Sequence, residues 1–180
     1  MKKPLFAFML FGLAVRTGAV MAGTPVVTLT ELGKGAFQIE GRFTVHASSR
    51  EAWRILSDYD RIGEFVSSVD SSKLMERTDG YALVKQINRN GIWFLRRNFE
   101  VLLKVTEIEG KRIEFEDISK NNFKSYRGAW QIEPSGGETQ VRYYLRVEHQ
   151  TWIPSFMVQG TIRKSVVSLL KEVAAEIEKK

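Results

Sequence analysis

The last quarter of the chain constrains the fold more than any other segment. It carries apolar residues spaced mostly three or four positions apart, which is the spacing of one face of an α-helix: Phe156, Ile162, Val166, Leu169, Val173 and Ile177. A Trp152-Ile153-Pro154 break precedes this segment, and a strand-like alternation over 139–150 precedes the break. A closing helix with so long an apolar face needs a broad surface to cover.

A run of antiparallel strands supplies that surface. Alternating apolar and polar residues are separated by turn residues such as Thr78-Asp79-Gly80 and Ser135-Gly136-Gly137. The succession along the chain predicts a meander and lacks the strand–helix rhythm of a parallel sheet. The expected strands are 26–32, 37–45, 71–77, 81–90, 93–108, 112–118, 123–134 and 139–150.

Two short helices are expected between the second and third strands. Ser48 and Glu51 have the spacing of a capping box, which predicts a helix N-terminus at this point. The helix that follows has an apolar side and ends near Gly63. Glu64-Phe65-Val66 begins a second short helix or a loop.

The first 22 residues have the layout of a secretory signal peptide. Lys2 and Lys3 precede an apolar run over 4–15, and small residues over 18–22 lead to an expected cleavage before Gly23. An uncleaved anchor is the alternative, but about 20 apolar residues are needed to span a bilayer, and Arg16 interrupts the run. We therefore predict one folded domain over 23–180 in a periplasmic or secreted protein.

Composition narrows the classes of partner. The chain has no cysteine, which excludes disulfides and thiolate metal sites. Without Lys2, Lys3 and Arg16, 24 basic and 21 acidic residues remain, a net charge of +3. So mild a charge argues against nucleic acid as a partner and still allows transient contact with an anionic membrane surface. We expect a monomer with no cofactor.

No motif of nucleophilic or metal-assisted catalysis occurs. The sequence lacks a Gly-x-Ser-x-Gly elbow, a Cys–His pair, an HExxH helix and a paired His-x-His. Its paired acids on one strand, Glu114 and Glu116, together with Glu109 and Asp117, are interpreted as a solvated edge.

Three stretches resemble the START-like, or SRPBCC, superfamily, and within it the polyketide cyclase/dehydratase and coenzyme Q-binding START branch. They are 52–59 (AWRILSDY) with Phe65 and Val66, 128–134 (GAWQIEP) with Gly136-Gly137 and 141–143, and Ile153-Pro154 opening the last helix. The resemblance implies an α+β helix-grip fold, a curved antiparallel sheet wrapped around a long C-terminal helix. It also implies a cavity for a hydrophobic guest, with Tyr59, Gly128 and Trp130 as packing and bend residues.

Strand parity then gives candidate ligand-binding residues. Apolar and aromatic residues on one face of the expected strands would meet the helix stripe, either around a cavity or as a solid core. Apolar residues near the chain connections would form a gate or plug one end. The candidate set is Phe65, Trp93, Arg97, Phe99, Tyr126, Trp130, Tyr143, His149, Trp152, Phe156, Ile162 and Val166.

Two polar members of this set have competing interpretations. Arg97 falls between Leu95 and Phe99 in the apolar parity, so it meets a polar guest, pairs with an inner acid such as Asp117, or turns outward at a bulge. His149 continues the apolar parity of the last strand near the mouth, or is a rim histidine.

Three functions are consistent with these observations. The first is an exported, non-catalytic binding or carrier protein for a hydrophobic or lipid-like molecule. The second is a cyclase- or dehydratase-like enzyme on the same fold, using residues such as Tyr143 and His149. The third is a protein-interaction module that uses an outer sheet face bearing Arg142, Tyr144 and Arg146.

Overall fold

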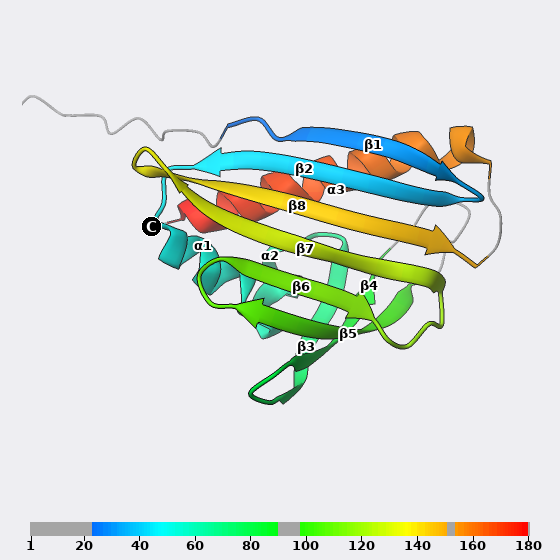
Figure 1. The fold of residues 1–180 in the computed structure, drawn as a ribbon, viewed down its shortest axis with the longest axis horizontal. Coiled ribbons are helices and arrows are strands. Elements are labelled where there is room, and N and C mark those ends of the chain that lie inside the picture. Colours follow the sequence, from blue (N-terminus) through cyan, green and yellow to red (C-terminus); the bar gives the residue numbers. More distant parts are fainter. Residues whose placement is uncertain (1–22, 90–97, 151–153, 180) are drawn as a thin grey trace, which may run out of the picture.

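One curved antiparallel sheet of eight strands dominates the structure, a computed structural model that describes residues 23–89, 98–150 and 154–179. The strands follow the order β1-β2-β8-β7-β6-β5-β4-β3 across the sheet (Figure 1). Their bounds are β1 Val26–Gly33, β2 Ala36–Val45, β3 Val69–Arg77, β4 Ala82–Asn88, β5 Phe99–Ile108, β6 Arg112–Asp117, β7 Phe123–Ser135 and β8 Glu138–His149.

The meander predicted after the two short helices is confirmed, because β3 to β8 are neighbours in chain order. The β1–β2 hairpin lies beyond β8, where Ile39 pairs with Leu145 across β2 and β8. The chain therefore crosses from one side of the sheet to the other between β2 and β3, and the edge strands are β1 and β3. The first part of the predicted long strand, 93–97, lies outside the described residues.

Three short elements make the crossing between β2 and β3. Helix α1 (Ser49–Leu56) begins with the predicted capping box, in which the Ser48 hydroxyl accepts from the Glu51 amide at 3.2 Å. The 3-10 helix η1 (Tyr59–Arg61) and helix α2 (Ile62–Phe65) follow directly. They bury Ala52, Ile55, Leu56 and Tyr59 against one end of the sheet.

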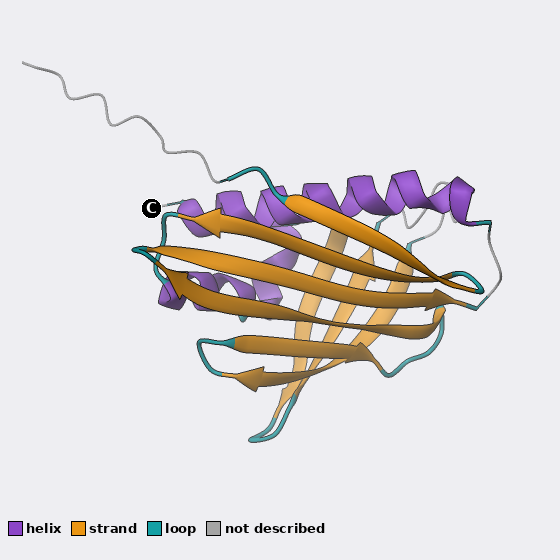
Figure 2. Ribbon diagram, turned by 45° about the horizontal axis from the view of Figure 1, so that its top comes forward, coloured by secondary structure: helices purple, strands orange, loops and turns teal. Residues whose placement is uncertain are grey.

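The long helix α3 (Ser155–Glu178) runs along the concave side of the sheet (Figure 2). Its buried stripe advances by three or four residues at each step, as expected for one helix face. The members of this stripe are Val158, Ile162, Val166, Leu170, Val173 and Ile177. The described part of the chain contains no helix long and apolar enough to cross a membrane.

The prediction that Phe156 begins the apolar stripe of this helix is wrong. Phe156 is 81% exposed. It stands six residues before Ile162, so it points about 240° around the helix from the buried face. Val158 lies on the buried face of the helix instead, and its side chain is fully buried.

The surroundings of Gly128 on β7 agree with its interpretation as a packing residue. A Cβ atom at this position would lie 2.3 Å from the backbone oxygen of Tyr144 and 2.5 Å from the Phe115 ring. Any side chain would therefore push β7 away from its neighbours. The absence of a side chain lets the Phe115 ring, which lines the cavity between the sheet and α3, pack against β7.

Candidate ligand-binding site

Two adjoining chambers lie between the concave face of the sheet and α3. The inner chamber has a volume of about 130 Å³ and is lined by α1, η1, α2 and the C-terminal half of α3 through Leu56, Tyr59, Phe65 and Val173. The outer chamber has a volume of about 380 Å³ and lies against the N-terminal half of α3 through Ile162, Ser165 and Val166. The outer volume alone falls in the range of small-molecule sites, about 300–1,000 Å³.

A continuous series of aromatic rings lines both chambers. Trp130 lies 4.5 Å from Tyr143 between ring centroids, and Tyr143 stacks on Phe115 at 6.4 Å. Phe115 then contacts Tyr126 at 6.1 Å, and Tyr126 contacts Phe123 at 5.1 Å. Because β6, β7 and β8 are neighbours in the sheet, this series runs across the strands from the inner to the outer chamber. The wall offers flat apolar surface to a guest.

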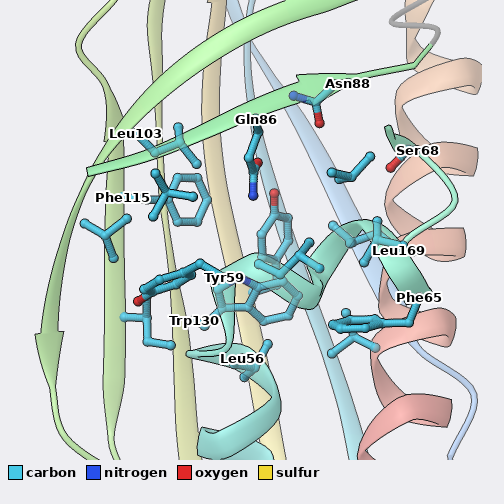
Figure 3. Close-up of a pocket in the computed structure, with 18 of the residues that line it drawn as sticks. Leu56, Tyr59, Phe65, Ser68, Gln86, Asn88, Leu103, Phe115, Trp130 and Leu169 are labelled. Atoms are coloured by element: carbon cyan, nitrogen blue, oxygen red, sulfur yellow. The ribbon is translucent and has the colours of Figure 1, made fainter. Parts of the chain in front are cut away.

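Uncharged polar groups gather where the chambers meet. Ser68, Asn88, Tyr126 and Tyr143 line both chambers and are called the collar here. Figure 3 shows the amides of Gln86 and Asn88 reaching from β4 toward the cavity, with Ser68 across from them. Gln86 already donates to the Ser72 hydroxyl at 3.2 Å. The buried Nδ2 atom of Asn88 has no acceptor among the described residues.

Burial keeps the two collar tyrosines protonated at neutral pH. Burial first, and then the negative charge of Asp117, raises the pKa of Tyr126 to about 12. Burial first, and then the adjacent Tyr126, raises the pKa of Tyr143 well above its usual value. Each therefore presents a neutral hydroxyl, which both donates and accepts hydrogen bonds.

His149 lies in the wall of the outer chamber rather than on the surface. It is 5% exposed, and its ring packs 5.3 Å from that of Phe123 between centroids. Burial lowers the pKa of His149, so the imidazole is neutral at pH 7. No carboxylate pairs with its side chain among the described residues. The other histidine, His46, lies far from the cavity and pairs with Glu138 at 2.9 Å.

The interpretation of Asp117 as part of a solvated edge is wrong. Asp117 is 4% exposed because it pairs with Leu103 across β5 and β6 and so shares the concave face. Its Oδ1 accepts from the amides of Leu102 and Ser119 at 3.1 and 3.0 Å, while Oδ2 has no partner among the described residues. Its suggested partner Arg97 lies outside the described residues.

Polar contacts hold together the elements around the inner chamber. The Tyr59 hydroxyl donates to Glu107, which Arg77 also contacts at 2.8 Å. Glu172 on α3 accepts from the amide and the hydroxyl of Ser67 at 3.0 and 2.6 Å. These contacts fix η1 and the α2–β3 connection against the sheet and the helix.

The structure brings together most of the candidate residues that it describes. Phe65 and Trp130 line the inner chamber, Phe99, His149, Ile162 and Val166 line the outer chamber, and Tyr126 and Tyr143 line both. Phe156 lines neither chamber, because its side chain points away from the buried face of α3. Trp93, Arg97 and Trp152 lie outside the described residues.

Sequence reasoning missed the polar residues of β4. Gln86 and Asn88 continue the concave-face parity of Ala82 and Val84, so the alternation of this strand pointed to them. Phe115 and Phe123 were also missed. Within the described ranges, no group of three or more His, Asp or Glu side chains is placed to hold a metal ion.

A curved antiparallel sheet closed by a long C-terminal helix over an apolar cavity defines a START-like domain with the helix-grip fold. The chain belongs to the polyketide cyclase/dehydrase and lipid transport family, whose model matches residues 45–172. This confirms the resemblance found in the sequence. No curated protein matches the chain.

Solved structures of several proteins share this fold. The STAR-related lipid transfer protein from Xanthomonas axonopodis is 16% identical, with a TM-score of 0.67 over 85% of this chain and 99% of that one. The Zhui aromatase/cyclase from Streptomyces sp. R1128 is 14% identical, with a TM-score of 0.69 over 79% and 94%. A START superfamily protein from Mycobacterium smegmatis is 16% identical, with a TM-score of 0.68 over 78% and 97%.

Proposed function

We propose that this protein is a non-catalytic binding or carrier protein that holds a hydrophobic or lipid-like molecule between the sheet and α3. The observation that carries the proposal is the aromatic-lined pair of chambers, of which the outer one has polar residues Arg89 and Asn98 at an exposed rim. Burying an apolar guest there contributes roughly 25 cal/mol per Å² before the costs of association. The outer rim gives such a guest a route from solvent.

The chemistry of the cavity supports binding more than turnover. A general acid or base works best with a pKa near the operating pH. The pKa values of Tyr126 and Tyr143 are raised far above neutrality, and His149 lacks a described carboxylate to orient it. These groups suit hydrogen bonding to a guest.

Native mass spectrometry of the gently purified protein tests this proposal. We expect a bound apolar molecule that organic extraction releases. Leu169 lines both chambers, so Leu169→Trp should fill the junction and abolish retention. Phe156→Trp is the matched control, because its side chain is outside the cavity on the same helix and retention should persist. A protein that neither retains nor takes up an apolar molecule would contradict the proposal.

An enzyme on this fold is the second candidate, favoured by the cyclases and dehydrases that the family description includes and by a histidine in the cavity wall. His149→Gln separates the two. Turnover of a polyketide-like substrate that is lost in this variant, with binding retained, would favour catalysis. Unchanged ligand retention with no turnover in either protein favours the carrier.

We further propose that the protein is exported as a monomer to the periplasm or beyond the cell after removal of residues 1–22. The support is the charged, apolar and small-residue layout of that segment. Exposed Phe156 and Met157 at the start of α3 support a transient contact with a membrane surface. A mature mass beginning at Gly23, a monomer mass in solution and weak vesicle binding lost in Phe156→Ser are the expected results.

A further inference from the structure

The collar differs in chemistry from the walls on either side of it. Apolar surface from Val84, Leu103 and Phe115 lies on the inner side, and apolar surface from Phe99, Leu145 and Val166 lies on the outer side. Between them stand three hydroxyls and one amide, from Ser68, Tyr126, Tyr143 and Asn88. The two tyrosine hydroxyls hydrogen-bond each other, but a purely hydrocarbon guest spanning both chambers would leave the Asn88 amide without water and without a partner among the described residues.

Asn88 is the collar member with the clearest unmet hydrogen-bonding capacity. Its Nδ2 atom is buried with no acceptor, and no hydrogen bond is formed by its amide oxygen to another described side chain or backbone group. Rotating the terminal amide by a half-turn therefore breaks no hydrogen bond within the described structure. That rotation exchanges two groups of nearly equal size and presents the N–H donors to the cavity.

The charges around the collar favour an uncharged partner. Both tyrosines keep their protons, the imidazole of His149 is neutral at pH 7, and Asp117 places a negative charge near Tyr126. The nearest described cation of the cavity lining, Arg89, is exposed at the rim and is paired with Asp70. A carboxylate held at the collar would face a like charge without a described counter-ion.

We propose that the collar selects an apolar ligand that carries a neutral carbonyl oxygen between two apolar parts, and that the Asn88 amide donates a hydrogen bond to this oxygen. This inference rests on the proposed binding function and specifies the chemistry of its ligand. The two apolar parts occupy the inner and outer chambers, and the Tyr126 hydroxyl, which accepts from Tyr143, supplies a further donor.

Matched small probes test this selection. Benzophenone places a carbonyl between two rings, diphenylmethane has the same rings without the oxygen, and diphenylacetate adds a carboxylate. Calorimetric titration of the wild-type protein should show benzophenone binding about tenfold more tightly than diphenylmethane, the worth of one net hydrogen bond. Diphenylacetate should bind more weakly than either.

Asn88→Leu should remove most of the tenfold preference while diphenylmethane binds as before. Asn121→Leu is the matched control, since it makes the same exchange at an exposed position that lines neither chamber and should keep the preference. Tyr126→Phe keeps the ring and should reduce the preference about threefold. An unchanged preference in Asn88→Leu, or equal binding of the two neutral probes by the wild type, would overturn this inference and leave the carrier function standing. Failure of every probe to bind would overturn both.

Discussion

The two ends of α3 contact the rest of the fold in different ways. At the C-terminal end, Leu170 and Val173 are buried, and Glu172 and Glu176 bond to Ser67 and to Arg61 and Lys179. At the N-terminal end, Phe156 and Met157 are exposed, and no side chain caps the helix at Pro154.

The difference separates stability from access along one helix. The C-terminal half closes the inner chamber with buried apolar contacts and charge-assisted hydrogen bonds, which resist opening. The N-terminal half borders the larger, outer chamber with fewer described polar contacts to the rest of the fold. We therefore expect a guest to enter from the N-terminal side of α3, because local opening is easiest where few contacts must break.

The largest expected effect contrasts one apolar side chain from each end. Leu170 is fully buried, so Leu170→Ala should lower the free energy of unfolding by roughly 2–5 kcal/mol through lost burial and a cavity. Phe156→Ala should change it by less than about 0.5 kcal/mol because the ring is exposed. Urea denaturation measures both. Equal losses at the two positions would erase the proposed difference between the ends.

The second prediction concerns Tyr126 in the collar, between the two chambers, and the stability of the protein at alkaline pH. Tyr126 holds its proton more tightly in the folded protein, where its pKa is about 12, than in the unfolded chain, where it is about 10. Its stabilisation is therefore full below about pH 10 and is lost as the pH rises toward about 12. Tyr126→Phe should reduce the wild-type loss of stability between about pH 9 and pH 12 by up to about 2–3 kcal/mol.

Denaturation curves at several alkaline pH values measure this difference. The matched control is Tyr144→Phe on the outer, convex face of the same sheet, because Tyr144 is 38% exposed. An equal change in the Tyr144→Phe curves would show that the effect does not depend on burial in the cavity. Parallel wild-type and Tyr126→Phe curves across the whole pH range would show that Tyr126 in the collar is not shielded from water.

The sequence predicted the elements that follow a local pattern better than the pairing of distant strands. The bounds of β7 and β8 were predicted nearly to the residue, because turn residues separate the two strands and β8 buries one face and exposes the other. Helical spacing predicted the C-terminal half of α3 but misplaced Phe156, since a six-residue step does not stay on one helix face. The position of the β1–β2 hairpin beside β8 depends on long-range pairing, which no local pattern encodes.

The sequence predicted the site residues whose position follows from the alternation of buried and exposed side chains along a strand. It missed the residues whose role depends on side chains from other strands. Tyr126, Tyr143 and Trp130 followed from parity and line the cavity as expected for that face. Asn88 is polar within an apolar face, and its importance comes from Ser68 and the tyrosines that surround it in space. Asp117 was interpreted both as an inner acid and as part of a solvated edge, and its register with Leu103 decides for the buried face.

The third prediction weakens the closed end itself. Glu172→Gln removes the charge that strengthens two hydrogen bonds from Ser67 and should lower the free energy of unfolding by about 1 kcal/mol. Hydrogen exchange at the amides of residues 66–69 should accelerate more than exchange elsewhere, because this connection loses its tie to α3. Lys171→Gln, an exposed change on the adjacent residue, should leave that exchange unchanged. Uniform acceleration across the sheet would mean that Glu172 supports the whole fold.

The smallest expected effect concerns the open end and acidic pH. Burial lowers the pKa of His149 below its unfolded value of about 6.5, so the folded protein prefers the neutral ring. Stability from this group is present above about pH 6.5 and is lost as the pH falls through the lower, folded pKa. His149→Gln should therefore flatten the acid side of the stability curve without changing stability at about pH 8 by more than about 1 kcal/mol. Because His149 lines the outer chamber, ligand should also be released more readily in acid by the wild type than by this variant. Equal acid release from both proteins would place the pH-sensitive group elsewhere and would leave the outer chamber insensitive to its only described histidine.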